Sequence, residues 1–253
     1  MSTNKIALVT GGSRGLGKNM ALSIAKRGLD VILTYHSNKE AADDVVAEIK
    51  KLGQQAVAFQ LDTSDTSGFK EFFEGISSYL KEKYNADSFD YLINNAGTGI
   101  YKPFLDTTET DFDEMMNIHI KGVYFLSQQA VPLLSDGGGI INISSGLARF
   151  SLPGSSAYAS MKGAVEVFTK YLAKELSNRK IRVNVVAPGA VATDFGGGEN
   201  RENEKKRSLI SQNTALGRVG EPEDIGGIVA FLCTEDARWI NGQRIEASGG
   251  IML

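Results

Sequence analysis

The chain has 253 residues, of which 42% are hydrophobic and 23% charged, and its formal net charge at pH 7 is −3. A balance this close to neutral predicts no nucleic-acid partner and no attraction to an anionic membrane surface, and no apolar stretch reaches membrane-spanning length. The single cysteine, Cys233, excludes an intrachain disulfide, and with only two histidines in the chain no zinc-type ligand cluster is expected. We therefore expect a soluble, cytoplasmic protein without a metal site.

Short apolar runs bounded by turn residues recur along the whole chain. They occupy residues 5–10, 30–35, 56–61, 89–94, 139–144, 181–187 and 243–248. Between them lie longer segments such as 17–28 and 38–53, where apolar residues recur every three or four positions, as they do in helices. Alternating strands and helices predict a parallel sheet covered on both faces. No linker or composition break interrupts the pattern, so we predict one doubly wound, Rossmann-type α/β domain over residues 1–253.

A glycine-rich turn follows the first predicted strand. In "TGGSRGLG", residues 10–17, glycines stand at 11, 15 and 17, and a helix is predicted to follow. Glycines let the backbone turn tightly, and a helix amino terminus offers N–H groups and a positive dipole to a phosphate. An ordinary loop between strand and helix is the alternative. The position after the first strand favours dinucleotide binding, through Gly11, Ser13, Arg14, Gly15, Leu16 and Gly17.

The end of the second predicted strand bears on which dinucleotide is bound. Sites for NAD usually carry an Asp or Glu here that holds the ribose 2′-hydroxyl. This chain has Tyr35, His36 and Ser37 instead, and its first acid is Glu40. Without a carboxylate to repel it, a 2′-phosphate could be bound by Arg14 together with these polar groups. We therefore predict NADP(H) rather than NAD(H), the alternative being that these side chains are merely exposed polar groups.

Two further strand ends place polar or small residues at the same edge of the sheet. Asp62 and Thr63 follow the third predicted strand, where Asp62 can accept a hydrogen bond from an adenine amino group. The motif "NNAG" follows the fourth strand and places Asn94, Ala96 and Gly97 beside the cofactor ribose. Small residues there let the backbone lie close to the sugar. The asparagines could instead be simple turn formers.

A tyrosine and a lysine four residues apart form a chemically distinctive pair. If the stretch "SSAYASMK", residues 155–162, is helical, Tyr158 and Lys162 lie on one face of the helix. A free tyrosine has a pKa of about 10, and a nearby ammonium group favours its phenolate form. We therefore predict that Lys162 lowers the pKa of Tyr158 toward the range useful for acid–base chemistry. From the spacing alone, a packed ring with an exposed charge is the alternative.

Together these motifs resemble the short-chain dehydrogenase/reductase family over essentially the whole chain. The matching stretches are, in order, "TGGSRGLG", "LDTSD", "NNAG", "MMNIHIKG", "INISSG", "YASMK" and "APGAVAT". Thirteen residues separate Ser145 from Tyr158, which is the family's spacing. The resemblance implies a seven-stranded parallel sheet, a homodimer or homotetramer, and hydride transfer between a nicotinamide cofactor and a small carbonyl or alcohol substrate.

The same resemblance assigns roles to individual residues. It makes Tyr158 the catalytic acid and base, with three catalytic partners, Asn117, Ser145 and Lys162. Tyr158 and Lys162 also contact the cofactor, whose nicotinamide half is bordered by Pro188, Gly189, Val191 and Thr193. His119 lacks a partner that the sequence can identify, and Cys233 stands in an apolar run, so both are expected to be structural.

The substrate pocket is expected between three loops. They are the segment after "NNAG", the segment 194–216, and the residues between Ser145 and Tyr158, which include Arg149 and Phe150. Segment 194–216 combines three consecutive glycines with dense charge, and we predict that it forms a substrate lid.

The most similar subgroup is the 3-oxoacyl-[acyl-carrier-protein] reductases. An acidic carrier protein requires a basic docking patch, yet Ser135 and Asp136 precede the fifth predicted strand, and only Lys174 is available nearby. The identity of the carbonyl therefore stays open. We predict an NADP(H)-dependent oxidoreductase that interconverts a ketone and a secondary alcohol. A non-catalytic NADP(H)-binding sensor on the same fold is the alternative, and the complete catalytic set argues against it.

Overall fold

The computed structural model describes residues 4–253, and these contain a seven-stranded sheet in which every neighbouring pair is parallel. The strand order is β3-β2-β1-β4-β5-β6-β7. The strands are β1 (Ile6–Val9), β2 (Asp30–Tyr35), β3 (Ala56–Gln60), β4 (Phe89–Asn94), β5 (Leu134–Ile143), β6 (Arg182–Pro188) and β7 (Arg244–Ala247). The order reverses between β1 and β4, and doubly wound sheets bind ligands at the carboxyl ends of such a pair. The predicted α/β fold and its seven-stranded sheet are confirmed.

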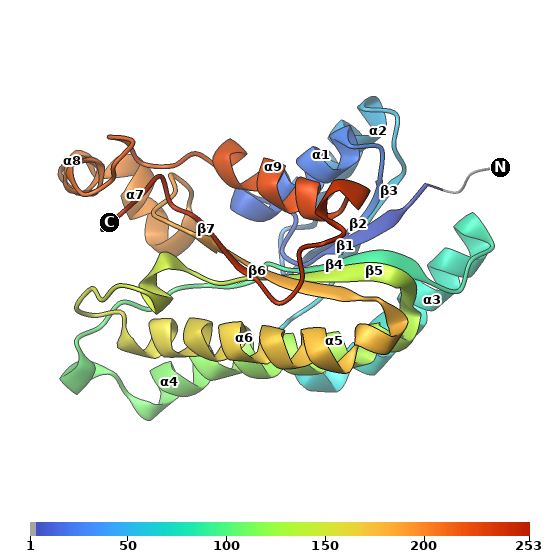
Figure 1. Ribbon diagram of the computed structural model, residues 1–253, viewed down its shortest axis with the longest axis horizontal. Helices are drawn as coiled ribbons and strands as arrows, with labels where there is room; N and C mark the ends of the chain where they lie inside the picture. Colours follow the sequence, from blue (N-terminus) through green and yellow to red (C-terminus); the bar gives the residue numbers. More distant parts are fainter. Residues whose placement is uncertain (1–3) are drawn as a thin grey trace.

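Helices cover both faces of the sheet (Figure 1). One face carries α1 (Gly15–Lys26), α2 (Lys39–Lys51) and α9 (Glu223–Leu232). The other carries α3 (Phe69–Tyr84), α4 (Glu109–Met116), α5 (Gly122–Ala130) and α6 (Ser156–Glu175). Two short helices, α7 (Glu199–Glu202) and α8 (Glu204–Gln212), extend beyond the end of the sheet. Across residues 4–253, no helix combines the length and apolar character that a membrane crossing needs.

Alternation of side chains along each strand gives the sheet a core on either face. Ala7 and Val9 pack with α1, α2 and α9, whereas Ile6 and Leu8 pack with α3 and α5. Successive residues of a strand point to opposite faces. Because both faces are covered, the strands read in the sequence as continuous apolar runs. Each large apolar side chain that is buried contributes roughly 1.5–3 kcal/mol to the stability of the fold. The two cores therefore hold the strands firmly, and the strand ends that carry the site are held with them.

Strand β5 begins five residues before the apolar run that predicts it. It starts at Leu134 and includes the glycine-rich stretch before residue 139. Gly137 has a φ of +78°, and a Cβ on Gly138 would overlap the carbonyl oxygen of Asp90 in β4. The pairing of β4 with β5 shifts register at this point. An irregularity built from glycines has no apolar periodicity, which is why the sequence pattern does not reveal it.

Candidate active site

Hydrogen bonds from the "NNAG" segment fasten the carboxyl ends of β1 and β4 together. Asn95 Nδ2 donates to the Thr10 carbonyl oxygen at 2.9 Å, and the Ala96 N–H donates to Thr10 Oγ1 at 3.0 Å. Gly11 takes a φ of +64°, which glycine adopts without strain, and a Cβ on Gly17 would overlap the Gly11 carbonyl oxygen. The result is a loop of bare backbone that leads directly into α1.

This loop fits the phosphates of a dinucleotide. Helix α1 starts at Gly15, and the N–H groups of its first turn have no acceptor within the helix. No acidic side chain stands in that turn to repel an anion. Ser13 and Arg14 precede it, while Leu16 packs against the core under the helix. The glycine-rich residues would therefore hold the phosphates mainly through backbone N–H groups.

Two predicted cofactor residues have their side chains inside the protein. Tyr35 is only 8% exposed and packs in the core between the sheet and α1 and α2, and its cofactor-binding role remains a prediction. Alternation along β2 turns this ring inward. Asn94 donates from Nδ2 to Asn142 Oδ1 at 2.8 Å and to Ser127 Oγ at 3.0 Å. Its amide therefore supports the "NNAG" turn from within the sheet.

The residues predicted to read the adenine and the 2′-phosphate lie at the outer rim. His36 and Ser37 are exposed after β2, and His36 Nε2 lies 3.6 Å from Asp62 Oδ2. Asp62 Oδ1 accepts from the Ser64 N–H at 2.8 Å, so the carboxylate is held in place beside Thr63. No acid follows β2 before Glu40. This rim suits a phosphorylated ribose better than a free 2′-hydroxyl.

Arg14 has a partner that the sequence does not predict. Its Nη1 lies 2.7 Å from Asp194 Oδ2, at the root of segment 194–216. The guanidinium remains 76% exposed at the glycine-rich loop, so its remaining N–H groups face solvent beside the cofactor rim. The 2′-phosphate role of Arg14 remains a prediction.

The segment after β6 faces the glycine-rich loop. It follows Pro188, the last residue of β6, and packs Gly189 against Ser248, where a Cβ on the glycine would lie 2.8 Å from Ser248 Cα. The buried Val191 accepts at its carbonyl from the Thr193 N–H at 3.0 Å. A Cβ on Gly15 would lie 3.7 Å from Thr193 Cβ. These residues thus border the space next to the predicted phosphate site.

Ser145, Tyr158 and Lys162 are brought together where β5 ends and α6 begins. Lys162 Nζ lies 5.5 Å from the centroid of the Tyr158 ring and donates to the Ile143 carbonyl oxygen at 2.8 Å. The Ser145 side chain lies near the Tyr158 hydroxyl and lowers the pKa of the phenol. Tyr158 is 7% and Lys162 5% exposed. The predicted helical spacing therefore yields a buried cluster rather than an exposed lysine.

Burial controls the protonation of this cluster. Desolvation raises the pKa of Tyr158 above its ordinary value of 10, with a smaller contribution from Tyr101, and outweighs the hydrogen bond from Ser145 that lowers it. Desolvation likewise lowers the pKa of Lys162 to about 7. The sequence-based expectation that Lys162 lowers the pKa of Tyr158 is not met, because removing both groups from water disfavours both charged forms. The phenol is thus protonated at neutral pH.

His119, and not Asn117, lies against Tyr158, the residue predicted to be the catalytic acid and base. The chain makes a π-helical turn over Asn117–Lys121, and the Asn117 carbonyl accepts from the N–H of Gly122. Within residues 4–253, no hydrogen bond or ring contact joins the Asn117 side chain to Tyr158 or Lys162. The His119 ring instead meets the Tyr158 ring edge-on, with centroids 5.0 Å apart. The catalytic role of Asn117 remains a prediction, and so does the purely structural role expected for His119.

Segment 194–216 folds over the site as two short helices, α7 and α8. Phe195 places its ring 5.9 Å from that of Tyr158. Lys206, in α8, has its Nζ 5.7 Å from the Tyr101 ring. Aromatic side chains thus meet at the mouth of the site, where a lid would close. A lid function for this segment remains a prediction.

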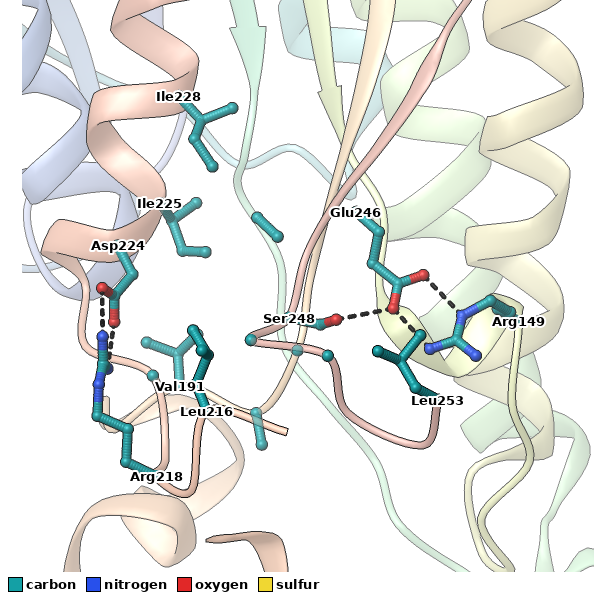
Figure 2. Close-up of a pocket in the computed structure, with 16 residues that line it drawn as sticks. Arg149, Val191, Leu216, Arg218, Asp224, Ile225, Ile228, Glu246, Ser248 and Leu253 are labelled. Carbon is teal, nitrogen blue, oxygen red and sulfur yellow. Dashed lines mark hydrogen bonds and ion pairs between the residues drawn. The ribbon is translucent and has the colours of Figure 1, made fainter. Parts of the chain in front are cut away.

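Arg149 lines a cavity next to the segment that follows β6. Figure 2 shows its guanidinium against Glu246 of β7, with Nε and Nη2 donating to the two carboxylate oxygens at 2.7 Å each. The cavity, of about 600 Å³, lies at the ends of β6 and β7 and is also lined by Arg218 and Asp224. A carboxylate far along the chain pairs with Arg149, whose role in the substrate pocket remains a prediction. Phe150 remains next to the site, against Gly146.

The fold, the glycine-rich loop and the cluster around Tyr158 define a dinucleotide-binding protein with an acid–base centre. Residues 11–252 match a family model described as enoyl-(acyl carrier protein) reductase. The chain belongs to the short-chain dehydrogenase/reductase family.

Named relatives are similar over nearly their whole length. The hydroxynaphthalene reductase-like protein Arp2 of Metarhizium brunneum is 37% identical over 257 residues, which cover 97% of this chain and 94% of that one. The reductase LugOII, described as promiscuous and as catalysing keto-reduction at C1 during lugdunomycin biosynthesis, has a TM-score of 0.93 at 40% identity, with 99% of each chain covered. The landomycin C-6 ketoreductase LanV, solved with NADP and rabelomycin, has a TM-score of 0.90 at 38% identity, covering 99% of this chain and 97% of that one.

Proposed function

We propose that the protein is an NADP(H)-dependent reductase that converts a ketone on a small, fused-ring aromatic compound into a secondary alcohol. The observation that carries this proposal is the buried, protonated Tyr158 beside Ser145, with Lys162 Nζ 5.5 Å from its ring centroid. A protonated phenol is the form needed to give a proton to a carbonyl oxygen.

The side chains divide the work on the substrate oxygen. A bound nicotinamide supplies the hydride for the carbonyl carbon. Ser145 donates a hydrogen bond to the carbonyl oxygen and stabilises the negative charge that develops there. Tyr158 then gives its hydroxyl proton to that oxygen and becomes a phenolate. Lys162, anchored at 2.8 Å to the Ile143 carbonyl, stabilises the phenolate until a proton from solvent replaces the one transferred.

The residues around the glycine-rich loop support NADP(H) as the cofactor. The backbone of residues 11–17 would hold the phosphates, Asp62 the adenine amino group, and Arg14 with His36 and Ser37 the 2′-phosphate. LanV, a relative of 38% identity, was solved with NADP bound.

The walls beside Tyr158 suit a planar apolar substrate. Phe195 and the side chain of Tyr101 flank the site, and Ile100 and Leu147 pack against the same cluster. Aromatic rings stack favourably against flat ring systems. The name of the Metarhizium relative refers to hydroxynaphthalene, a fused aromatic ring system. These features favour a fused-ring ketone over an aliphatic acyl chain.

Delivery of the substrate on a carrier protein finds no support in the described surface next to β5. Asp136 pairs there with Arg179 at 2.7 Å, so the basic side chain is already matched by a carboxylate. An acidic carrier needs unmatched positive charge for docking. A freely diffusing substrate is therefore the better fit.

Self-association as a homodimer or homotetramer is also part of the proposal. Helices α5 and α6 expose large apolar side chains, namely Tyr124, Phe125, Val167 and Tyr171 at 44%, 38%, 54% and 67%. Exposed apolar residues gathered on neighbouring helices mark interaction surfaces. Sedimentation of the wild type and of Val167→Asp measures this directly, and a monomeric wild type would contradict it.

The function is tested by following NADPH absorbance with a panel of ketones. The panel contains 1-tetralone, a naphthalenone and a 3-oxoacyl thioester, and each is repeated with NADH. We expect turnover of the fused-ring ketones with NADPH, and a loss of about 10²–10⁴-fold in kcat for Tyr158→Phe. Tyr171→Phe, an exposed tyrosine on the same helix, is the matched control and should keep full activity. Tight NADPH binding without turnover of any ketone would favour the alternative, a non-catalytic NADP(H)-binding sensor.

A further inference from the structure

His119 is a buried histidine with one ring nitrogen satisfied and one left over. It is 1% exposed, and its Nε2 lies 2.7 Å from the Thr98 carbonyl oxygen. A carbonyl oxygen only accepts, so Nε2 carries the proton in the neutral ring and Nδ1 is a bare acceptor. Within residues 4–253 this buried Nδ1 has no hydrogen-bond partner. A buried acceptor without a donor is unfavourable, so the position calls for a partner in the working enzyme.

The surroundings keep the His119 ring neutral and place it beside the acid–base centre. The titratable groups that face it are Tyr158, whose ring it meets edge-on at 5.0 Å and 88°, and Lys162 of the same helix. Burial first, and then the positive charge of Lys162, hold the pKa of His119 well below its ordinary value. Among the described residues of the loop that includes and follows "NNAG", the hydrogen-bond partner of the His119 ring is the Thr98 carbonyl oxygen. A Cβ on Gly97 would lie 2.6 Å from His119 Cε1, so glycine is needed there for the ring to fit.

Lys162 has donors to spare. Its ammonium group carries three N–H bonds, of which one reaches the Ile143 carbonyl at 2.8 Å. The same Tyr158 ring contacts both the ammonium, at 5.5 Å, and the imidazole, at 5.0 Å. An unpartnered acceptor and an incompletely partnered cation thus lie against one catalytic ring. They are complementary in hydrogen-bonding character, since one is an acceptor and the other a donor.

We propose that His119 is a positioning residue of the proton-transfer centre, whose bare Nδ1 accepts a hydrogen bond from a water that in turn accepts one from Lys162. This inference rests on the proposed function. This bridge gives the Lys162 side chain a second anchor besides the Ile143 carbonyl and holds it toward the oxygen of Tyr158 as that oxygen loses its proton. His119 neither gains nor loses a proton, and the reaction's proton still comes from Tyr158.

A merely structural role would act through the other nitrogen. In that case His119 would serve to tie the loop at Thr98 to the π-helical turn, and only the Nε2 donor would matter. Two amide substitutions separate the roles, because glutamine places its amide near the Nε2 position and asparagine near the Nδ1 position. His119→Gln keeps a donor for Thr98 and removes the acceptor, whereas His119→Asn does the reverse. His119→Phe keeps the ring and removes both.

The test measures kcat and KM for the reduction of a fused-ring ketone as a function of pH. Losing one hydrogen bond to a charged group corresponds to about a 10- to 100-fold fall in kcat for His119→Gln and His119→Phe, with KM changed by less than about threefold. His119→Asn should recover most of kcat and the wild-type pH profile. NADPH binding and circular dichroism verify that each variant is folded. High activity in His119→Gln together with low activity in His119→Asn would overturn the proposal.

A spectroscopic measurement decides the geometry without reference to catalysis. The chain has only two histidines, so ¹⁵N-histidine labelling gives two ring systems, and His36→Gln assigns them. We expect His119 in the neutral Nε2–H tautomer between about pH 6 and about pH 8, with its Nδ1 resonance shifted by hydrogen bonding and altered in Lys162→Met. An imidazolium, an Nδ1–H tautomer or an unchanged resonance would overturn it. Wild-type protein that reduces no ketone would instead refute the proposed function and leave this measurement interpretable.

Discussion

Replacing Glu246 by glutamine should destabilise the fold, because this carboxylate matches two arginines. It accepts from Arg149 at 2.7 Å through both oxygens, from Arg244 at 2.7 Å, and from Ser248 at 2.8 Å. Arg149 also donates to the carbonyl oxygens of the last residues, Ile251 and Met252. The pair therefore fastens the carboxyl-terminal segment to the loop that follows Ser145.

The size of the effect follows from the protonation of Glu246. The two arginines hold its pKa at about 2, against an ordinary value of 4.5, and that difference corresponds to about 3 kcal/mol. Its side chain is 18% exposed, so solvent screens the interaction little. For a chain of this size, a loss of about 3 kcal/mol lowers Tm by about 6–12 °C.

The matched control is Glu235→Gln. Glu235 pairs with Lys5 at 2.6 Å, but the two side chains are 74% and 43% exposed. An exposed pair contributes less than about 1 kcal/mol, so this variant should unfold nearly like the wild type. Thermal and urea unfolding at neutral pH compare the two variants.

The pH dependence provides the stricter check. The folded pKa of Glu246 lies below its unfolded value, so its stabilisation is complete above pH 4.5 and is lost as the pH falls toward about 2. The difference in unfolding free energy between wild type and Glu246→Gln should therefore be constant near neutrality and shrink below pH 4.5. A difference that does not vary with pH, or one no larger than that of Glu235→Gln, would refute this reasoning.

Three further predictions concern the site. Gly17→Ala should reduce NADPH affinity by more than about tenfold and lower Tm, because its Cβ would overlap the Gly11 carbonyl oxygen. Gly227→Ala, which has open space around its Cβ, is the control and should change neither. Calorimetry with NADPH compares the two variants. Arg14→Ala should weaken NADPH by about 10- to 100-fold and NADH by much less, and equal losses by fluorescence titration would show that it does not read the 2′-phosphate. Because burial lowers the pKa of Lys162 to about 7, the native state binds fewer protons than the unfolded chain above that pH. The unfolding free energy of the wild type, measured in urea, should therefore rise by up to about 2 kcal/mol relative to that of Lys162→Met between pH 7 and about pH 9. A difference that stays constant over this range would contradict this.

The features that the sequence determined by itself are those written in short stretches of chain. Strands buried on both faces require continuous apolar runs, and helices between them require apolar residues every three or four positions. Glycine is needed at positions 11 and 17 because a Cβ there would press against the backbone of Ala96 and of Gly11, respectively. The spacing of Tyr158 and Lys162 placed both on one helix face because the period of a helix is fixed.

Only the tertiary structure decided which distant groups meet and how water is excluded from them. Arg149 and Glu246 are 97 residues apart in the chain, and their pairing cannot be read from local pattern. The partners of His119 and Arg14 likewise come from other elements. The protonation of Tyr158 and Lys162 differs from the expectation for the same reason. Their pKa values depend on burial, and burial is produced by all the elements packed around them rather than by the four residues that separate them.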